Sequence, residues 1–343
     1  MRRVFFFGAG TTKADFPEAP LNDELLGEAL KISLPQAEPA KNKVKGFIND
    51  FFHICRGTAL PRVEDVLSFL DSNLLHQKFS CKGYGYEDFV KVRASLVYLI
   101  GQLFENTLKD NSKGVMKKFC GILTNDDLII STNYDIVADN ALREVRRNVN
   151  YGEKIRGNGT FSESYTLFGD EKTCISFQGH EERNELNKGD IELLKIHGSL
   201  NFLYCPKCKE IDITVGQKGI IYCMRKNFEV QCINQNCTGK YTDLVVAPTY
   251  YKIYDNAFLK ETWRRAEKAI ASADEIIFVG YSMPDADVEI KCMLLRGIAR
   301  NTTRPKVKVV NFKDGDVENR YLTLLGDIDY DDCGFEKYLS MIS

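Results

Sequence analysis

Short apolar runs alternate with helical patterns along most of this 343-residue sequence, and no other feature constrains its fold as strongly. The runs are continuous in Val, Ile, Leu and Phe, which is typical of strands buried on both faces. Alternation with helices favours a parallel sheet covered by helices on both sides, and therefore an α/β fold. Strands are expected at 3–7, 127–131, 191–199, 244–248, 275–280 and 306–310.

The composition limits the classes of partner. A hydrophobic content of 44% and a charged content of 27% are typical of a soluble globular protein. A net charge of -2 gives no general attraction to nucleic acid or to an anionic membrane. The apolar run after Arg2 and Arg3 enters a glycine turn rather than a signal cleavage site, and no run is long enough to span a bilayer. We expect a cytoplasmic protein that binds neither membrane nor nucleic acid.

Three segments interrupt the alternation. Residues 41–120 have helical periodicity and are predicted to be a helical insertion on the sheet domain. Residues 148–190 are polar and rich in Gly, which predicts irregular structure or short hairpins. Residues 201–241 hold clustered cysteines and are predicted to form a small zinc ribbon. One domain over 1–343 is expected to contain all three.

The cysteines favour a metal site. Eleven Cys, an odd number, are more consistent with free thiols and metal ligands than with a disulfide framework. Cys205 and Cys208 form a CxxC pair, and Cys232 and Cys237 form a second pair. Two such pairs around a short ribbon predict a tetrahedral Zn²⁺ site with four thiolates, which is closed and therefore structural. In the alternative ligand sets Cys223 replaces one of the four.

A glycine turn, Gly8-Ala9-Gly10, follows the first strand. Closely spaced glycines let the backbone approach a pyrophosphate, whose charge the amides bind, although a plain tight turn is the alternative. Lys13 stands where the dinucleotide fingerprint has its third Gly, and the next helix is predicted to begin only at Asn22. Both departures weigh against a dehydrogenase.

Polar residues also follow four later strands. Since the carboxyl ends of parallel strands meet at one edge, where such sheets bind ligands, these residues are expected to converge. Asn133 and Asp135 are placed to hold a ribose or a water, with helix capping as the alternative. His197 is the best candidate for a general base, with a purely structural histidine as the alternative. Gly280-Tyr281-Ser282 and Asn311-Phe312 end the last two strands.

The order of these motifs resembles the sirtuin family over most of the chain, the helical insertion excepted. The resemblance implies a Rossmann-like catalytic domain that uses NAD as its substrate. It implies that His197 is the base acting at the nicotinamide ribose and that Asn133 and Asp135 are the polar pair beside it. It also implies that Gly8, Ala9, Gly10 and Thr11 form the phosphate turn and that Ser282 and Asn311 lie on the adenosine side. Further candidates for NAD binding are Thr12, Asn22, Thr132, Gly280, Tyr281 and Phe312.

Two segments depart from the deacylating sirtuins. Those enzymes carry a Pro-Asp-Phe-Arg segment after the glycine turn, whereas TTKADFPEAPLND here has no Arg. They also carry a Phe-Gly-Glu-like strand after the second cysteine pair, where this chain has DLVVAPTYYKIYDN. STNYD, LLKIHGSLNF, APTYYK and VGYSMPDADVEI are more similar to a divergent bacterial sirtuin-like group, many of whose members hydrolyse NAD, often as effectors of antiviral defence.

The resemblance therefore implies an NAD⁺ glycohydrolase that releases nicotinamide and ADP-ribose. An NAD-dependent protein-lysine deacylase is the alternative, because both activities begin by cleaving the same bond. A non-catalytic sensor of NAD or ADP-ribose is a third hypothesis. It is motivated by the basic ribbon residues Lys207, Lys209, Lys218, Arg225 and Lys226, for which a solvated face is the alternative. Because a freely active NAD hydrolase would harm its host, we expect control by homo-oligomerisation or by an activating protein partner.

Overall fold

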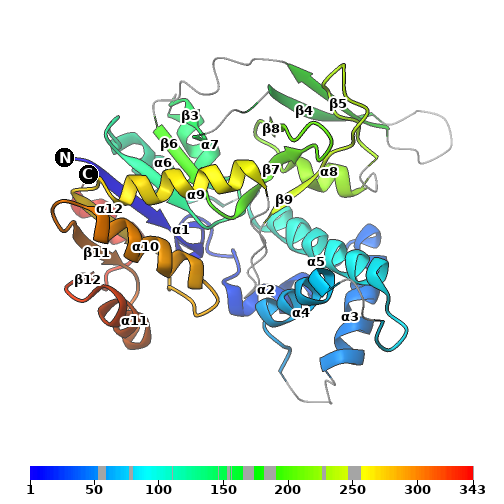
Figure 1. Ribbon diagram of the computed structural model, residues 1–343, viewed down its shortest axis with the longest axis horizontal. Helices are drawn as coiled ribbons and strands as arrows, with labels where there is room; N and C mark the ends of the chain where they lie inside the picture. Colours follow the sequence, from blue (N-terminus) through cyan, green and yellow to red (C-terminus); the bar gives the residue numbers. More distant parts are fainter. Residues whose placement is uncertain are drawn as a thin grey trace.

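Seven parallel strands form the main sheet of the computed structural model, in the order β12-β11-β10-β1-β2-β6-β3 (Figure 1). This result confirms the predicted α/β class with a Rossmann-like parallel sheet. The strands are β1 (Arg3–Phe7), β2 (Leu128–Ser131), β3 (Val149–Asn150), β6 (Ile191–Lys195), β10 (Glu275–Val279), β11 (Lys306–Val310) and β12 (Asp329–Asp331). The structure describes residues 1–52, 59–76, 80–109, 111–145, 147–152, 155, 157–164, 174–180, 191–225, 229–245 and 256–342.

Helices cover both faces of this sheet, as the continuous apolar runs predict. Phe5 and Phe7 point to one face, where they share a core with α6 (Val115–Ile122), α7 (Val137–Glu144) and α12 (Phe335–Ile342). Val4 and Phe6 point to the other face, toward α9 (Ala257–Ile270), α10 (Val288–Arg300) and α11 (Gly315–Leu325). Successive side chains of a strand point to opposite faces, so one run of Phe residues contributes to two cores.

The strand order reverses at β1. From β1 the chain continues to β2 on one side, and it later returns to β10 on the other side. Open α/β sheets bind ligands in the crevice at such a switch point, outside the carboxyl ends of the strands. The ends of β1 and β10 are therefore the expected centre of a site.

A second sheet of five strands stands beside the first, in the order β5-β4-β8-β7-β9 (Figure 1). Its β4 (Gly157–Ser164) and β5 (Cys174–His180) pair antiparallel, so the segment 148–190 does form a short hairpin. Its other strands are β7 (Gly198–Tyr204), β8 (Ile211–Thr214) and β9 (Thr242–Val245). The strand predicted over 244–248 ends at Val245, and the remainder lies outside the described residues. Helix α8 (Gly219–Arg225) lies within the cysteine-containing segment and was not predicted.

A layer of helices packs on the second sheet. It consists of α2 (Asn22–Lys31), η1 (Pro35–Ala37), α3 (Glu38–Phe52), α4 (Val63–His76) and α5 (Tyr86–Thr107), and its apolar stripes share one core with Leu200, Leu203 and Ile220. The stripe predicted along α4 is buried at Val63, Val66, Leu67 and Leu70. The helical layer, the second sheet and helix α8 therefore form one continuous hydrophobic core.

The prediction that no helix precedes Asn22 was wrong, because α1 (Ala9–Asp15) begins directly after β1. This short helix has no apolar stripe, and its buried residues are Thr11, Thr12 and Asp15. Tertiary contacts stabilise it instead. Asp15 Oδ1 accepts hydrogen bonds from Ser112 Oγ at 3.0 Å and from the Val115 amide at 2.9 Å.

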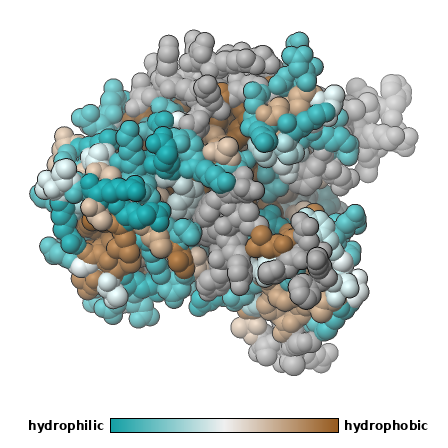
Figure 2. Space-filling model, in the orientation of Figure 1, coloured by the Kyte–Doolittle hydropathy of each residue, from teal (hydrophilic) through white to brown (hydrophobic). Residues whose placement is uncertain are grey.

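The coloured part of the face seen in Figure 2 is mostly hydrophilic. Figure 2 shows apolar side chains gathered on the face that carries α10, where Val288 and Leu295 are exposed. Within the described ranges, no helix combines the length and the apolar character that crossing a membrane requires.

Candidate active site

A pocket of about 1150 Å³ opens at the carboxyl ends of the parallel strands. It exceeds the roughly 300–1,000 Å³ of common small-molecule pockets, so it has room for a dinucleotide. Most of the predicted site residues line it, namely Ala9, Gly10, Thr12, Asn22, Thr132, Asn133, Asp135, His197, Gly280, Tyr281, Ser282, Asn311 and Phe312. The pocket lining does not include Gly8 or Thr11, which lie behind it.

Three glycines allow the loop after β1 and the loop after β10 to contact each other. A Cβ added to Gly8 would lie 2.6 Å from the Gly280 carbonyl oxygen, and one added to Gly10 would lie 2.7 Å from the Gly280 Cα. Gly280 itself has a φ of +59°, and its added Cβ would lie 2.5 Å from the Thr11 nitrogen. The Gly10 amide donates to the Gly280 carbonyl at 2.9 Å. Close packing of β1 and β10 thus explains the glycines before any ligand is considered.

The Asn133 side chain ties β2 to this glycine turn. Its Nδ2 donates to Gly8 O at 3.0 Å and to the hydroxyls of Thr11 and Thr12, both at 3.1 Å. Those hydroxyls already donate elsewhere, Thr11 to Gly8 O and Thr12 to Asp135 Oδ2. They therefore accept from Asn133, which fixes the orientation of its amide. The Oδ1 end, on a residue that lines the pocket, is the end left to bind a ligand.

Asp135 is held by protein groups at both carboxylate oxygens. Its Oδ2 accepts from Thr12 Oγ1 at 2.7 Å, and its Oδ1 accepts from the Val137 amide at the start of α7 at 2.9 Å. The residue is 5% exposed. Asp135 accepts an amide of the first turn of α7, as the helix-capping alternative expects, but it stands one residue before the N-cap, Ile136. It thus links the loop after β2 to α1 and α7. Thr132 is a further link, because its amide and its hydroxyl both donate to Phe7 O at 3.1 Å.

His197 occupies a corner between the two sheets. The strand predicted over 191–199 ends at Lys195, the chain turns at Ile196 and His197, and β7 begins at Gly198 in the second sheet. Gly198 has a φ of +73°, and a Cβ there would lie 1.8 Å from the Leu244 carbonyl oxygen of β9. Only glycine fits this turn, so the His-Gly pair is a requirement of the corner that presents the imidazole.

Two aromatic rings flank the His197 imidazole. The Tyr134 ring stacks on it with centroids 6.0 Å apart and an angle of 22° between planes. The Trp263 ring lies 6.5 Å away, and Trp263 Nε1 donates to the Ile196 carbonyl at 2.8 Å. The imidazole is 3% exposed, so these contacts and the turn fix its position at the pocket wall.

The loops after β10 and β11 form the other end of the pocket. Tyr281 is buried, and its hydroxyl donates to Asp287 Oδ2 at 2.7 Å. Arg320 donates from Nε to the Ser282 carbonyl at 3.0 Å, so backbone contacts hold this loop in place. Phe312, in contrast, is 70% exposed, although it also lines the pocket. An open aromatic ring at a pocket wall is suited to stacking on a planar base.

Apart from Asn22 at the start of α2, sequence reasoning missed the wall that the helical layer contributes. Arg62, Glu64 and Phe104 line the pocket from α4, α5 and the residues before α4. Glu64 is 7% exposed, and its Oε2 has no hydrogen-bond partner in the part of the chain that the structure describes. Burial raises the pKa of Glu64, with smaller contributions from its own backbone, Asp23, Arg62 and Asp65. No local pattern distinguishes this Glu from the many surface carboxylates.

Sequence reasoning also missed a buried ion pair behind the pocket. Lys195 Nζ lies 3.3 Å from Asp139 Oδ2, and the two side chains are 1% and 0% exposed. A Lys inside the apolar run LLKI was the available signal, because charged side chains are almost never fully buried unless they are paired.

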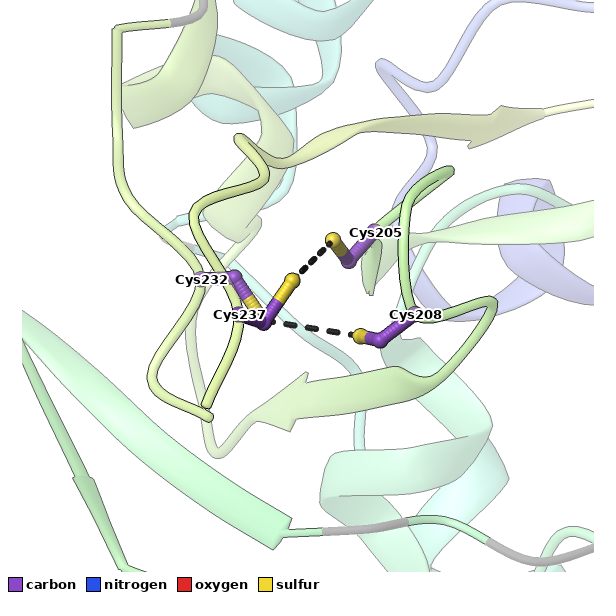
Figure 3. Close-up of side chains that lie close together, drawn as sticks. All are labelled: Cys205, Cys208, Cys232 and Cys237. Atoms are coloured by element: carbon purple, nitrogen blue, oxygen red, sulfur yellow. Dashed lines mark hydrogen bonds between the residues drawn. The ribbon is translucent and has the colours of Figure 1, made fainter. Parts of the chain in front are cut away.

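The four predicted cysteines lie together at the end of β7, with their side chains pointing toward one another (Figure 3). All four Sγ atoms lie within 4.8 Å of one another, and the Cys205–Cys237 and Cys208–Cys232 separations are both 3.7 Å. A tetrahedron with Zn–S bonds of about 2.3 Å has S···S edges of about 3.8 Å, so the arrangement fits one such ion. The cluster could therefore hold a metal.

Gly239 packs directly against the cysteine cluster, and Cys223 is not part of it. A Cβ on Gly239 would lie 2.5 Å from the Cys205 Sγ, and the Gly239 amide donates to the Cys237 Sγ at 3.3 Å. Cys223 lies on α8, buried in the core that the ribbon shares with the helical layer. Since Cys223 is not one of the four clustered thiols, the ligand sets that include it are not supported.

Of the described basic residues in this segment, Lys218 is buried, whereas Lys207, Lys209 and Arg225 are exposed. Lys218 is 7% exposed and pairs with Glu105 of α5 at 2.9 Å. Arg225 lies over the Tyr222 ring, 5.5 Å from its centroid. Lys207 donates to Thr238 Oγ1, and Lys226 lies outside the described residues. These contacts weaken the charge pattern that motivated a docking surface.

Comparison with known proteins gives one family. No curated protein matches the sequence. A family model described as SIR2-like domain matches residues 127–325, more than half of the chain. The matched range contains Asn133, His197, Ser282 and all four clustered cysteines. This agrees with the sirtuin resemblance carried by the strand-end motifs, and the chain belongs to the SIR2-like domain family.

Proposed function

We propose that this protein is an NAD⁺ glycohydrolase that cleaves NAD⁺ into nicotinamide and ADP-ribose. The observation that carries the proposal is that His197 and Asn133, from two different strand ends, line one pocket at the switch point of the sheet. The SIR2-like family implies use of NAD. The volume of the pocket and the open Phe312 ring at its other end suit a dinucleotide.

The chemistry assigns a role to each group. The bond between ribose C1′ and the pyridinium nitrogen breaks with its electron pair going to nicotinamide, through a transition state of oxocarbenium character. A water oxygen then bonds to C1′, and His197 accepts the proton that the water loses. Asn133 Oδ1 orients the ribose or the water, because its Nδ2 is fixed on the glycine turn. Asp135 acts as a positioning residue through Thr12 and α7.

Two features favour water over an acyl-lysine as the nucleophile. The segment after the glycine turn lacks the Arg of the deacylating sirtuins, and part of it forms α1. The segment after Cys237 lacks their Phe-Gly-Glu-like strand. The distinctive part of that segment, APTYYK, lies outside the described residues, so this second feature rests on the sequence alone.

We also propose Zn²⁺ as the metal of the cysteine cluster, with a structural role. Four thiolates complete a tetrahedral shell and leave no position for a substrate. Cys205 directly follows β7, whose first residue is Gly198 of the His197 corner. The ion would therefore brace the sheet that carries one wall of the site.

We further propose membership of the divergent bacterial, defence-associated group, on the phrases STNYD, LLKIHGSLNF and VGYSMPDADVEI. Such a role requires that activity be held back until it is needed, by a homo-oligomer or by an activating partner. Loss of cellular NAD during phage challenge of cells that carry the protein is the expected result, and an unchanged NAD level would contradict this role.

The test is incubation of the purified protein with NAD⁺, with and without an acetylated peptide. Nicotinamide and ADP-ribose formed without peptide support the glycohydrolase, and His197→Ala should lower the turnover number about 10²–10⁴-fold. O-acetyl-ADP-ribose formed only with peptide would show a deacylase. If the protein binds NAD⁺ without turnover, the assay is repeated on the protein after size-exclusion chromatography and crosslinking, which test for an oligomer. Binding without turnover in every form would show a sensor.

A further inference from the structure

The buried pair Lys195–Asp139 joins two segments that carry the proposed catalytic residues. One is the turn after β6, which contains His197, and the other is the segment from β2 to α7, which contains Asn133 and Asp135. Lys195 is the last residue of β6, two positions before His197. Asp139 lies in the first turn of α7, shortly after Asn133 and Asp135. Their charged atoms are 3.3 Å apart, and neither residue lines the pocket.

The Lys195 ammonium group also reaches the second loop directly. Besides Asp139, its Nζ donates a hydrogen bond to the backbone carbonyl of Asp135. The side chain thereby connects the end of β6 to the loop between β2 and α7. His197 and Asn133 lie on the two segments that this side chain connects.

Tyr151, which follows β3, and Asn201 of β7 also hold Asp139. Its Oδ1 accepts from Tyr151 Oη at 2.6 Å and from Asn201 Nδ2 of β7 at 3.2 Å. Burial is the largest influence on the carboxyl group and opposes its ionisation. The Lys195 and Arg143 charges and the hydrogen bonds outweigh burial and lower the pKa of Asp139, which favours its carboxylate form.

A wholly buried ion pair needs an explanation other than stability. Moving two charges out of water costs about as much as their attraction returns, and apolar replacements of such pairs are often neutral or stabilising. An ion pair with hydrogen bonds holds its two partners in a defined geometry, and apolar packing lacks this directionality. The geometry points to Lys195 and Asp139 as positioning residues that set the separation of His197 from the Asn133–Asp135 loop, an inference that rests on the proposed NAD cleavage.

The test removes both charges while keeping the acceptor for Tyr151, in the double variant Lys195→Met/Asp139→Asn. The turnover number for NAD⁺ should fall about 10²-fold, the loss that a misplacement of about 1 Å produces, while KM changes little. The single variant Lys195→Met leaves an unpaired buried carboxylate and should melt at a lower temperature than the double variant. If the double variant melts at a higher temperature than the single variant but its turnover number stays low, the loss of activity comes from misplaced residues and not from lower stability.

The matched control is Arg3→Met/Asp127→Asn, which introduces the same two residues in place of an ion pair of 2.6 Å at the amino ends of β1 and β2 in the same sheet. This control should have a lower melting temperature than the wild type and an unchanged turnover number. Trp263 is the only Trp of the chain, and its ring lies 6.5 Å from His197. Its fluorescence emission should therefore shift in the Lys195→Met/Asp139→Asn variant and stay unchanged in the control.

Wild-type turnover and an unshifted Trp263 emission in the folded double variant would overturn the positioning role and leave the proposed function intact. If the wild type itself does not cleave NAD⁺, the proposed function fails, and the Trp263 shift still decides whether the pair sets the His197 corner. Should the double variant not fold, Tyr151→Phe removes one hydrogen bond to Asp139 without a change of charge. It should lower the turnover number several-fold at unchanged KM, and wild-type turnover in that variant would equally contradict the inference.

Discussion

The side-chain amide of Asn133 donates a hydrogen bond to the Gly8 carbonyl at 3.0 Å, which joins the end of β2 to the glycine turn after β1. These residues are 125 positions apart in the sequence. The same nitrogen bonds the Thr11 and Thr12 hydroxyls, so one side chain holds the turn, the start of α1 and the pocket wall in one arrangement.

Asn133→Ala should therefore impair both stability and catalysis. The free energy of unfolding should fall by about 1 kcal/mol, because the side-chain hydrogen bonds to Gly8, Thr11 and Thr12 are lost while Gly8 O keeps its donors from Thr11. Turnover of NAD⁺ should fall about 10²-fold, because the orienting oxygen is lost. Asn301→Ala is the control, since Asn301 Nδ2 donates to the Ala273 carbonyl at 2.8 Å away from the pocket. It should lower stability and spare turnover, and wild-type turnover in Asn133→Ala would remove Asn133 from the site.

Gly198→Ala should prevent correct formation of the His197 corner. Its new Cβ would lie 1.8 Å from the Leu244 carbonyl oxygen, so β9 must move, at a cost of about 3 kcal/mol or more. Gly216→Ala is matched in backbone strain, with a φ of +69°, but its Cβ meets no described atom within 4 Å. That control should lose only about 1–2 kcal/mol. Chemical denaturation measures both, and equal losses would show that the close approach of β9 is unimportant.

The purified protein should contain about one zinc ion per chain, bound by four thiolates. Cys232→Ser should lose the metal and have a lower melting temperature, because one of the four thiolate ligands is then missing. Cys223→Ala is the control and should retain the metal, since Cys223 is not one of the four clustered thiols. Elemental analysis and the absorption spectrum of the cobalt-substituted protein measure the outcome, and loss of metal in Cys223→Ala would return that residue to the ligand set.

Glu64→Gln should stabilise the protein at neutral pH and not in acid. Burial raises the pKa of Glu64, so its contribution to stability is most favourable when it is protonated, and it worsens as the pH rises through the raised value. The neutral amide removes this penalty, which should add about 1 kcal/mol at pH 7.5. The gain should vanish near the ordinary Glu pKa of about 4.3.

The matched control for that experiment is Glu87→Gln in α5, whose carboxylate is 85% exposed and 3.8 Å from Lys91. An exposed ion pair contributes little, so this variant should change stability by less than about 1 kcal/mol at either pH. A loss of stability in Glu64→Gln at pH 7.5 would mean that the buried carboxylate has a favourable partner in the folded protein.

The main elements were predictable because their signals are local. Continuous apolar runs identify the buried strands, since a strand covered on both faces has no polar side. The stripe from Val63 to Leu70 identifies α4. The spacing of Cys205, Cys208, Cys232 and Cys237 identifies the cluster, because a closed metal site needs its four ligands in two short turns.

Other features depend on partners that no local window contains. Helix α1 has no apolar stripe, and Asp15 holds it to Val115, 100 residues away. The role of Gly198 depends on the Leu244 carbonyl in a different strand. Glu64 resembles any surface carboxylate until the helical layer folds over the pocket.

The sequence by itself determined the class of the sheet, the grouping of the four cysteines and the candidates at the strand ends, because periodicity and spacing are written along the chain. Only the tertiary structure decided which end of the Asn133 amide faces the pocket, and that Lys195 finds Asp139 behind it. Hydrogen-bond direction and burial of charge are set by atoms brought together from distant positions. That is why the tertiary structure supplied the orientation of residues that the sequence had already named.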